Sequence, residues 1–316
     1  MNIDTNANTK RIQHSLIMAA VTAALACSMI AGNAFAGDGD STKTKTTWTW
    51  NFGHNVSYGN NQTKGSGVTK EESRAVANFS QLTLALPANV TITQGATESL
   101  TITADDNLLP LMSTRVINNE LLIEGDNNRG FSTKKEIKIR LTVKSLNNIN
   151  IKGSGDVHGD QLKSDKLAIA IEGSGDVKFN TIRADQFKIG IVGSGDVSID
   201  AVESKLLEST VRGSGDVKFG AVKAGQVNIS VTGSGDISAA GTADKVVIEL
   251  SGSGDVRTSR LIAREVDVKV IASGDADVHA TEKLNASVRG SGDIRYAGAP
   301  KKVDKEIKGS GSIEAM

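Results

Sequence analysis

Aspartates that recur at a nearly constant interval are the residues of this sequence best suited to chemistry. Each one ends a Gly-Ser-Gly-Asp tetrad, or Ala-Ser-Gly-Asp in one case, and there are eight of them: Asp156, Asp176, Asp196, Asp216, Asp236, Asp255, Asp275 and Asp293. Successive tetrads begin 18 to 20 residues apart, and a last one, Gly309-Ser310-Gly311-Ser312, carries serine in place of the aspartate. Carboxylates are ligands of hard cations and groups for general acid–base catalysis, so both kinds of chemistry have to be weighed.

A column of stacked aspartates needs compensation for its charge. Carboxylates about 5 Å apart repel by about 1 kcal/mol per pair in bulk water. Backbone amides and serines at the glycine-rich corner are one source of compensation, and a ladder of cations such as calcium is another. Calcium-binding nonapeptide repeats carry Gly-Gly-x-Gly-x-Asp at a nine-residue spacing, which differs from this motif in spacing and glycine count. We therefore favour hydrogen bonding, keep the cation ladder as the alternative, and predict no resident metal or cofactor.

The regularity of the aspartates argues against catalysis. Glycoside hydrolysis needs two carboxylates in different environments, whereas these recur identically in every repeat. The four histidines, His14, His54, His158 and His279, show no pair at metal-ligand spacing. Ser154 and His158 are neighbours in sequence, but no third group supports them as a nucleophile and its base. The sequence predicts no catalytic residues, and a polysaccharide lyase or hydrolase is the alternative.

A partly basic stripe accompanies the aspartates. Two residues after each one stands a position expected to point outward: His158, Lys178, Ser198, Lys218, Ser238, Arg257, Asp277 and Arg295. These cations could compensate the acidic column across neighbouring repeats. Alternatively Lys178, Lys218, Arg257 and Arg295 form a face that binds an extended anionic polymer, such as a surface glycan, weakly at each repeat and many times over.

Apolar residues alternate with polar ones around each tetrad, which indicates strands with one buried face. In one repeat the inward residues before the tetrad are Phe187, Ile189 and Ile191; those after the preceding tetrad are Val177 and Phe179, followed by a third site at Ile182. A unit of about twenty residues cannot bury its apolar face alone, so equivalent strands must stack in parallel. The pattern predicts an all-β solenoid, a parallel β-helix, and the handedness of parallel crossovers favours a right-handed one.

Four regions follow along the chain. Residues 1–36 have a basic start, an apolar run and the small-x-small site Ala34-Phe35-Ala36, which predict a cleaved signal peptide. Residues 37–73 are predicted to be a flexible linker, 74–151 irregular, strand-rich first coils, and 152–316 the regular repeat with a C-terminal cap. Cys27, the one cysteine, is interpreted as a signal residue, with lipidation as the alternative. Trp48 and Trp50 fit a capping strand, a binding element or a disordered tether.

Composition excludes some partners. Lysine plus arginine and aspartate plus glutamate number 36 each, so no net field favours nucleic acid or an anionic membrane surface. After the signal no segment is apolar for long enough to cross a membrane as a helix, and we expect no transmembrane span in the mature chain.

The chain also resembles a known bacterial family. Arg74-Ala75-Val76-Ala77-Asn78-Phe79, Val90-Thr91-Ile92-Thr93-Gln94-Gly95 and the run of Ser-Gly-Ser-Gly-Asp coils are similar to the "putative auto-transporter adhesin, head GIN domain" family over about residues 74 to 313. The resemblance implies an exported β-helical envelope protein and carries no catalytic residues. We therefore expect a non-catalytic protein of the periplasm, cell surface or exterior that adheres to a surface glycan or an envelope protein. The ligand and the oligomeric state are left open.

Overall fold

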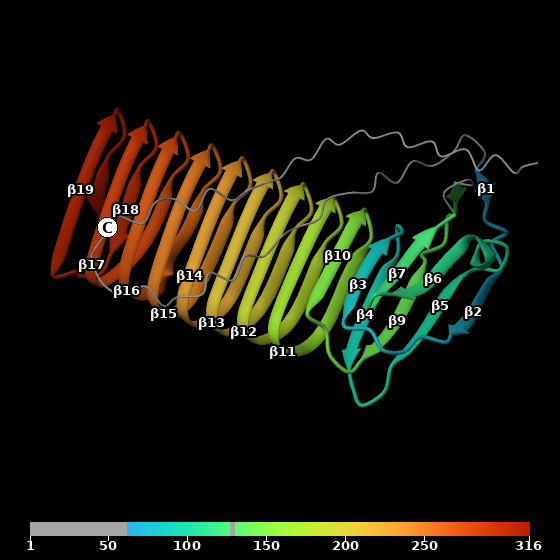
Figure 1. Ribbon diagram of the computed structural model, residues 1–316. Helices are drawn as coiled ribbons and strands as arrows, with labels where there is room; N and C mark the ends of the chain where they lie inside the picture. The colour runs from blue at the N-terminus through green and yellow to red at the C-terminus, as the bar shows by residue number, and fades with distance from the viewer. Residues whose placement is uncertain (1–61, 127–129) are drawn as a thin grey trace, which may run out of the picture. The chain divides into compact units, whose positions relative to one another are not determined.

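The computed structural model describes residues 62–126 and 130–316, which are almost entirely β-structure. The one helix among these residues is a single 3₁₀ turn, Leu109–Leu111. No helix of the described residues is long and apolar enough to cross a membrane. Figure 1 shows the regular part as a stack of equivalent coils that run in the same direction. The prediction of an all-β solenoid of parallel coils of about twenty residues is confirmed.

Each regular coil is one long, bent strand that is interrupted only at the tetrad. The strands are β11 (Asp156–Gly173), β12 (Val177–Gly193), β13 (Val197–Gly213), β14 (Val217–Gly233), β15 (Ile237–Gly252), β16 (Val256–Ala272) and β17 (Ala276–Gly290). Each pairs in parallel with the next, so that Val177, Val197 and Val217 are direct neighbours. The sequence predicted two strands separated by corners, but the ladder between β12 and β13 skips only Asn180 and Asp185 and continues through both bends.

The bends divide each coil into three inward faces. In β12 the buried apolar residues are Val177 and Phe179 on the first face, Ile182 and Ala184 on the second, and Phe187, Ile189 and Ile191 on the third. Burial of these apolar side chains from water is the main favourable contribution to the fold. The inward residues expected from the alternation lie in the core, and the position of Ala184 is an additional one that the sequence analysis did not single out.

Glycine is strongly favoured where the corner of one coil meets the next, and Ala272, with φ of 125°, is the one substitution for glycine among the tetrads Gly153 to Gly309. Gly193 has φ of 133°, and a Cβ on it would lie 2.2 Å from the carbonyl oxygen of Gly173. The second glycine of the same tetrad, Gly195, would place a Cβ 2.2 Å from the carbonyl oxygen of Gly175. The amide of Ser194, between them, donates to the carbonyl of Gly173 at 2.8 Å. The corners therefore stack backbone on backbone, as the tetrad predicts.

The first coils follow a different order in space than along the chain. β3 (Gln81–Ala85) pairs in parallel with both β7 (Glu120–Gly125) and β10 (Asn148–Gly153). β4 (Asn89–Gln94) likewise lies between β9 (Lys138–Val143) and β11. The coil that comes first in sequence is thus inserted between a later coil and the regular stack.

Antiparallel strands cover the N-terminal end of the stack. β5 (Ser99–Asp105) pairs antiparallel with β9 and with β2 (Thr69–Arg74), and β6 (Met112–Ile117) pairs antiparallel with β7. A short parallel pair joins β1 (Thr63–Lys64) to β8 (Phe131–Ser132).

The strands β1 and β2 begin within the segment that the sequence analysis assigned to a linker. The first coils, expected to be irregular, contain antiparallel pairs as well as parallel ones. β2 escaped notice because Thr-Lys-Glu-Glu-Ser-Arg is largely exposed, and charged residues suit such an edge strand. The signal, Cys27, Trp48, Trp50 and the first part of the linker lie outside the described residues.

The C-terminal end consists of three short strands. β18 (Ile294–Ala297) and β19 (Lys302–Gly309) both pair in parallel with β17, and β20 (Ile313–Ala315) pairs in parallel with β18. β19 and β20 form the last coil of the stack (Figure 1).

A pair of glycine substitutions tests the close approach of the corners. Gly153 also has a positive φ, of 100°, but a Cβ on it would have no neighbour within 4 Å. We expect Gly153→Ala to cost about 1–3 kcal/mol from backbone strain alone. Gly193→Ala should lower the urea midpoint further, because it adds a clash with Gly173 to the strain. Equal midpoints for the two variants would contradict the packing of the corners.

Candidate functional site

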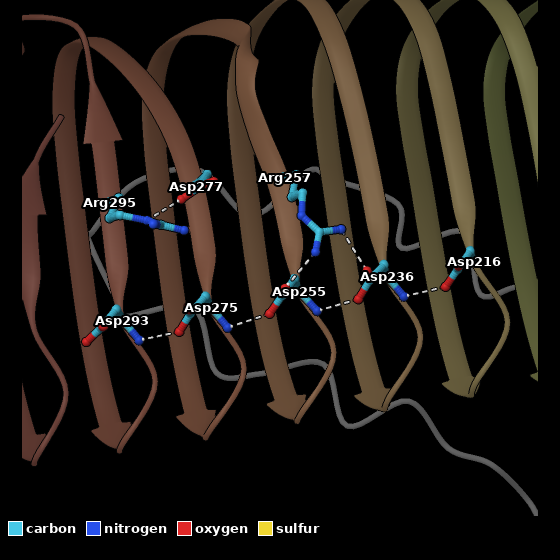
Figure 2. A network of polar contacts seen from close by, with 8 residues as sticks. All are labelled: Asp216, Asp236, Asp255, Arg257, Asp275, Asp277, Asp293 and Arg295. Atoms are coloured by element: carbon cyan, nitrogen blue, oxygen red, sulfur yellow. Dashed lines mark hydrogen bonds and ion pairs between the residues drawn. The ribbon is translucent and has the colours of Figure 1, made fainter.

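The aspartates form a hydrogen-bonded ladder along one corner of the stack. Oδ1 of Asp156 accepts the backbone N–H of Asp176 at 2.9 Å, and Oδ1 of Asp176 accepts that of Asp196 at 2.9 Å. The pattern continues through every coil to Asp293, which accepts the amide of Ser312 at 2.7 Å and its hydroxyl at 3.0 Å. Figure 2 shows the part of this ladder from Asp216 to Asp293.

Backbone hydrogen bonds on the other side of each aspartate complete the corner. The amide of Val157 donates to the carbonyl of Asp176 at 2.8 Å, and Val177 donates in the same way to Asp196 at 2.8 Å. The ladder bonds, by contrast, run from amides to ionised carboxylates, and such hydrogen bonds are among the stronger ones in proteins. The ladder bonds therefore offset the repulsion between neighbouring aspartates. At the last coil the hydroxyl of Ser312 adds one more bond.

Arginines bind the second oxygen of some carboxylates. Arg257 bridges two rungs, with Nη1 2.7 Å from Oδ2 of Asp236 and Nη2 2.8 Å from Oδ2 of Asp255 (Figure 2). Arg295 donates through Nε to Oδ1 of Asp277 at 2.8 Å. The hydrogen bond to Asp236 raises the pKa of Arg257 above its ordinary value, so this guanidinium stays charged. Arg257 thus compensates the charge of the neighbouring aspartate column, whereas Arg295 pairs with Asp277 on the preceding coil of its own column.

The two lysines of the basic stripe differ from the arginines. Lys178 and Lys218 are exposed and stand in one column with Ser198 between them. Within the described part of the chain, neither lysine forms an ion pair. The four cations that the sequence grouped as one face are therefore two bound arginines and two lysines whose ammonium groups are available.

A furrow along the bend between the second and third faces is a further surface feature. It consists of two hollows of about 610 and 760 Å³ that share Lys163, Ser164 and Asp165. Its floor is a column of small residues in register: Ser164, Ala184, Ser204, Ala224 and Ala243. The furrow was missed in the sequence analysis, although a small residue recurring at one position of the repeat was the available signal.

Charged residues of both signs line the furrow. Arg183 pairs with Glu203 at 3.4 Å, and Lys205 pairs with Asp185 at 2.7 Å. These side chains are exposed, and exposed ion pairs contribute little to stability because water competes for the charges. The walls of the furrow thus carry charges of both signs and would affect a bound ligand mainly through their shape.

His279 contacts the backbone of the neighbouring coil. Nδ1 of His279 lies 3.1 Å from the carbonyl oxygen of Ser259, which fixes the ring against the neighbouring coil. Within residues 62–126 and 130–316, no three side chains of His, Cys, Asp or Glu gather in a way that could hold a metal ion.

The model of one protein family matches most of this chain. Residues 78–201 and 191–300 both match the model of the family described as "Putative auto-transporter adhesin, head GIN domain". The chain belongs to this family. The match confirms the resemblance seen in the tetrads and in the strands that precede them, and it spans both the irregular first coils and most of the regular ones.

Solved structures share the fold of this head GIN domain chain. A "putative lipid binding protein" from Parabacteroides distasonis ATCC 8503 is 26% identical, with a TM-score of 0.60, and the match covers 81% of this chain and 99% of that one. A "putative adhesin" from Parabacteroides merdae ATCC 43184 is 20% identical, with a TM-score of 0.66, and the match covers 81% of this chain and 99% of that one. Another, from P. distasonis ATCC 8503, is 22% identical, with a TM-score of 0.66, and the match covers 81% and 100%. No curated protein matches the chain.

Two substitutions of one aspartate test what the ladder contributes. Asp196→Ala removes the acceptor of the Asp216 amide at 2.8 Å, and we expect a loss of about 1–3 kcal/mol in the free energy of unfolding. Asp196→Asn keeps a carbonyl oxygen and removes a charge, so its loss should be smaller. Asp200→Ala, an exposed aspartate of the same coil, is the control and should change stability by less than about 0.5 kcal/mol. If Asp196→Ala costs no more than this control in urea unfolding, the carboxylate does not support the corner.

Proposed function

We propose that this protein is exported by its N-terminal signal and acts without catalysis, by adhering to an extended acidic polysaccharide in the cell envelope or at the cell surface. Membership of a family described as adhesin heads supports adhesion as the general role. The polymer as the ligand, the export and the absence of catalysis are parts of the proposal.

The observation that carries the proposal is the strict register of the outward columns. His158, Lys178, Ser198, Lys218 and Ser238 are direct neighbours on successive coils. Parallel strands lie about 4.8 Å apart, so a contact recurs along the column wherever its residue type recurs, as Lys178 and Lys218 do two coils apart. A polymer that follows the stack would sum many weak contacts, since each later contact is made at a high effective concentration.

The chemistry of the two adjacent columns favours an acidic polysaccharide. Lys178 and Lys218 offer cations to a carboxylate or sulfate of the polymer. Asp176, Asp196 and Asp216 are exposed beside them, and each uses Oδ1 for an amide of the next coil. The second carboxylate oxygen of each aspartate accepts hydrogen bonds from sugar hydroxyls. A polyanion without hydroxyl groups would be repelled by the aspartates.

Binding to immobilised polysaccharides tests this function. The purified protein should bind an acidic polysaccharide more tightly than a neutral one, and added salt should weaken the binding because it screens the lysines. Lys178→Ala with Lys218→Ala should lower the affinity at least about tenfold, which corresponds to about 1.4 kcal/mol.

The matched control is Lys205→Ala with Lys223→Ala, which removes two lysines from the furrow on neighbouring coils. This control should bind like the wild type. Unchanged binding by the Lys178 and Lys218 variant would overturn the assignment of the lysine column, and a loss confined to the control would place the polymer in the furrow.

A further inference from the structure

The last strand of the stack, β19, departs from the pattern of the core. It pairs with β17 along one edge, and no strand of the described residues pairs with its other edge. The register places Val303, Lys305 and Ile307 beside the buried residues Leu284, Ala286 and Val288, so these three are inward positions. Val303 and Ile307 are nevertheless 36% and 48% exposed, because no coil covers them.

A lysine occupies the middle inward position of this strand. The same column holds Ile229, Ile248, Val268 and Ala286 in the four coils before it. Lys305 is therefore a charged residue at a place where the preceding coils carry apolar side chains. Alternation alone would have predicted another aliphatic residue.

The side chain of Lys305 lies across the end of the core. Its Nζ donates to the carbonyl oxygen of Ile313 at 2.9 Å and lies 4.8 Å from the centre of the Tyr296 ring. Tyr296 pairs in register with Val278 and Ala315, so it belongs to the first face, whereas Lys305 starts from the third face. The aliphatic stem thus covers the apolar end of the core while the ammonium keeps polar and aromatic partners.

An exposed edge strand above an apolar core is a template for pairing with another chain, and inward-pointing charges are one means by which proteins prevent it. A second stack on this end would bury the Lys305 ammonium between two layers of apolar residues, which is costly without a paired charge. The aspartate ladder also ends here, because Ser312 stands in the place of the next aspartate and offers no carboxylate to a further coil.

We propose that Lys305 prevents the C-terminal end of the stack from pairing with a second copy of this chain. A second copy is the partner excluded because its identical β19 edge offers backbone groups and the exposed Val303 and Ile307 to match. The opposite end of the stack is covered by antiparallel strands, so two copies without this charge would meet through their C-terminal ends about a twofold axis.

Sedimentation velocity on purified protein over a wide concentration range tests the proposal. Lys305→Met keeps the length of the side chain and removes its charge, and we expect its dimer dissociation constant to be at least tenfold lower than that of the wild type. Lys302→Met, an outward lysine of the same strand, and Lys305→Arg should both sediment like the wild type.

A second variant locates the contact. Adding Ile307→Asp to Lys305→Met restores a charge at an inward position and should return the protein to the wild-type association state. Circular dichroism establishes that each variant is folded. If Lys305→Met stays as monomeric as the wild type, if Lys302→Met dimerises equally, or if Ile307→Asp leaves the dimer intact, the proposal is wrong.

Discussion

At nearly all the corners the backbone of one coil lies so close to that of the preceding coil that glycine is the residue that fits, and Ala272, with φ of 125°, is the exception. A Cβ on Gly193 or Gly195 would lie 2.2 Å from a carbonyl oxygen of the coil below. This contact allows only one register between neighbouring coils, because a slip by one residue would bring a side chain into the corner. It also places the carboxylate of one aspartate beside the amide of the next, at distances such as 2.9 Å between Asp176 and Asp196. The fold is thus held by a close backbone contact, made by glycine at every first tetrad position after Gly153 except Ala272, and by a hydrogen bond that follows from this contact.

The register that the corners fix also applies to the outward-facing side chains. Because equivalent residues stand above one another, a single outward position becomes a column, and its chemistry is repeated from coil to coil. The acidic ladder, the lysines beside it and the furrow wall of Arg183, Glu203 and Lys223 are all columns of this kind. Such a surface suits contact with a repetitive ligand, and the same repetition leaves an exposed end, where the placement of Lys305 becomes important.

The sequence predicted the features that depend on one repeat and its neighbour. Tetrad spacing and alternation were enough for the parallel coils and for inward residues such as Phe179 and Ile189. The inserted coil of β3 and β4 was not predictable, because it pairs with strands on both sides that come later in the chain. The role of Arg257 was left open for a related reason: an outward arginine can bind a polymer or its own chain, and only its distances to Asp236 and Asp255 decide.

Disulfide cross-linking in a Cys27→Ser background tests the register most directly. Lys178 and Ser198 are partners on neighbouring coils, so Lys178→Cys with Ser198→Cys should oxidise readily, since parallel partners lie within the range of Cα distances that a disulfide spans. Lys178→Cys with Asp200→Cys is offset by two residues, which places the Cα atoms about 8 Å apart, and this pair should stay reduced. Equal cross-linking of both pairs, or cross-linking of the offset pair alone, would contradict the stacking on which the fold and the surface columns depend.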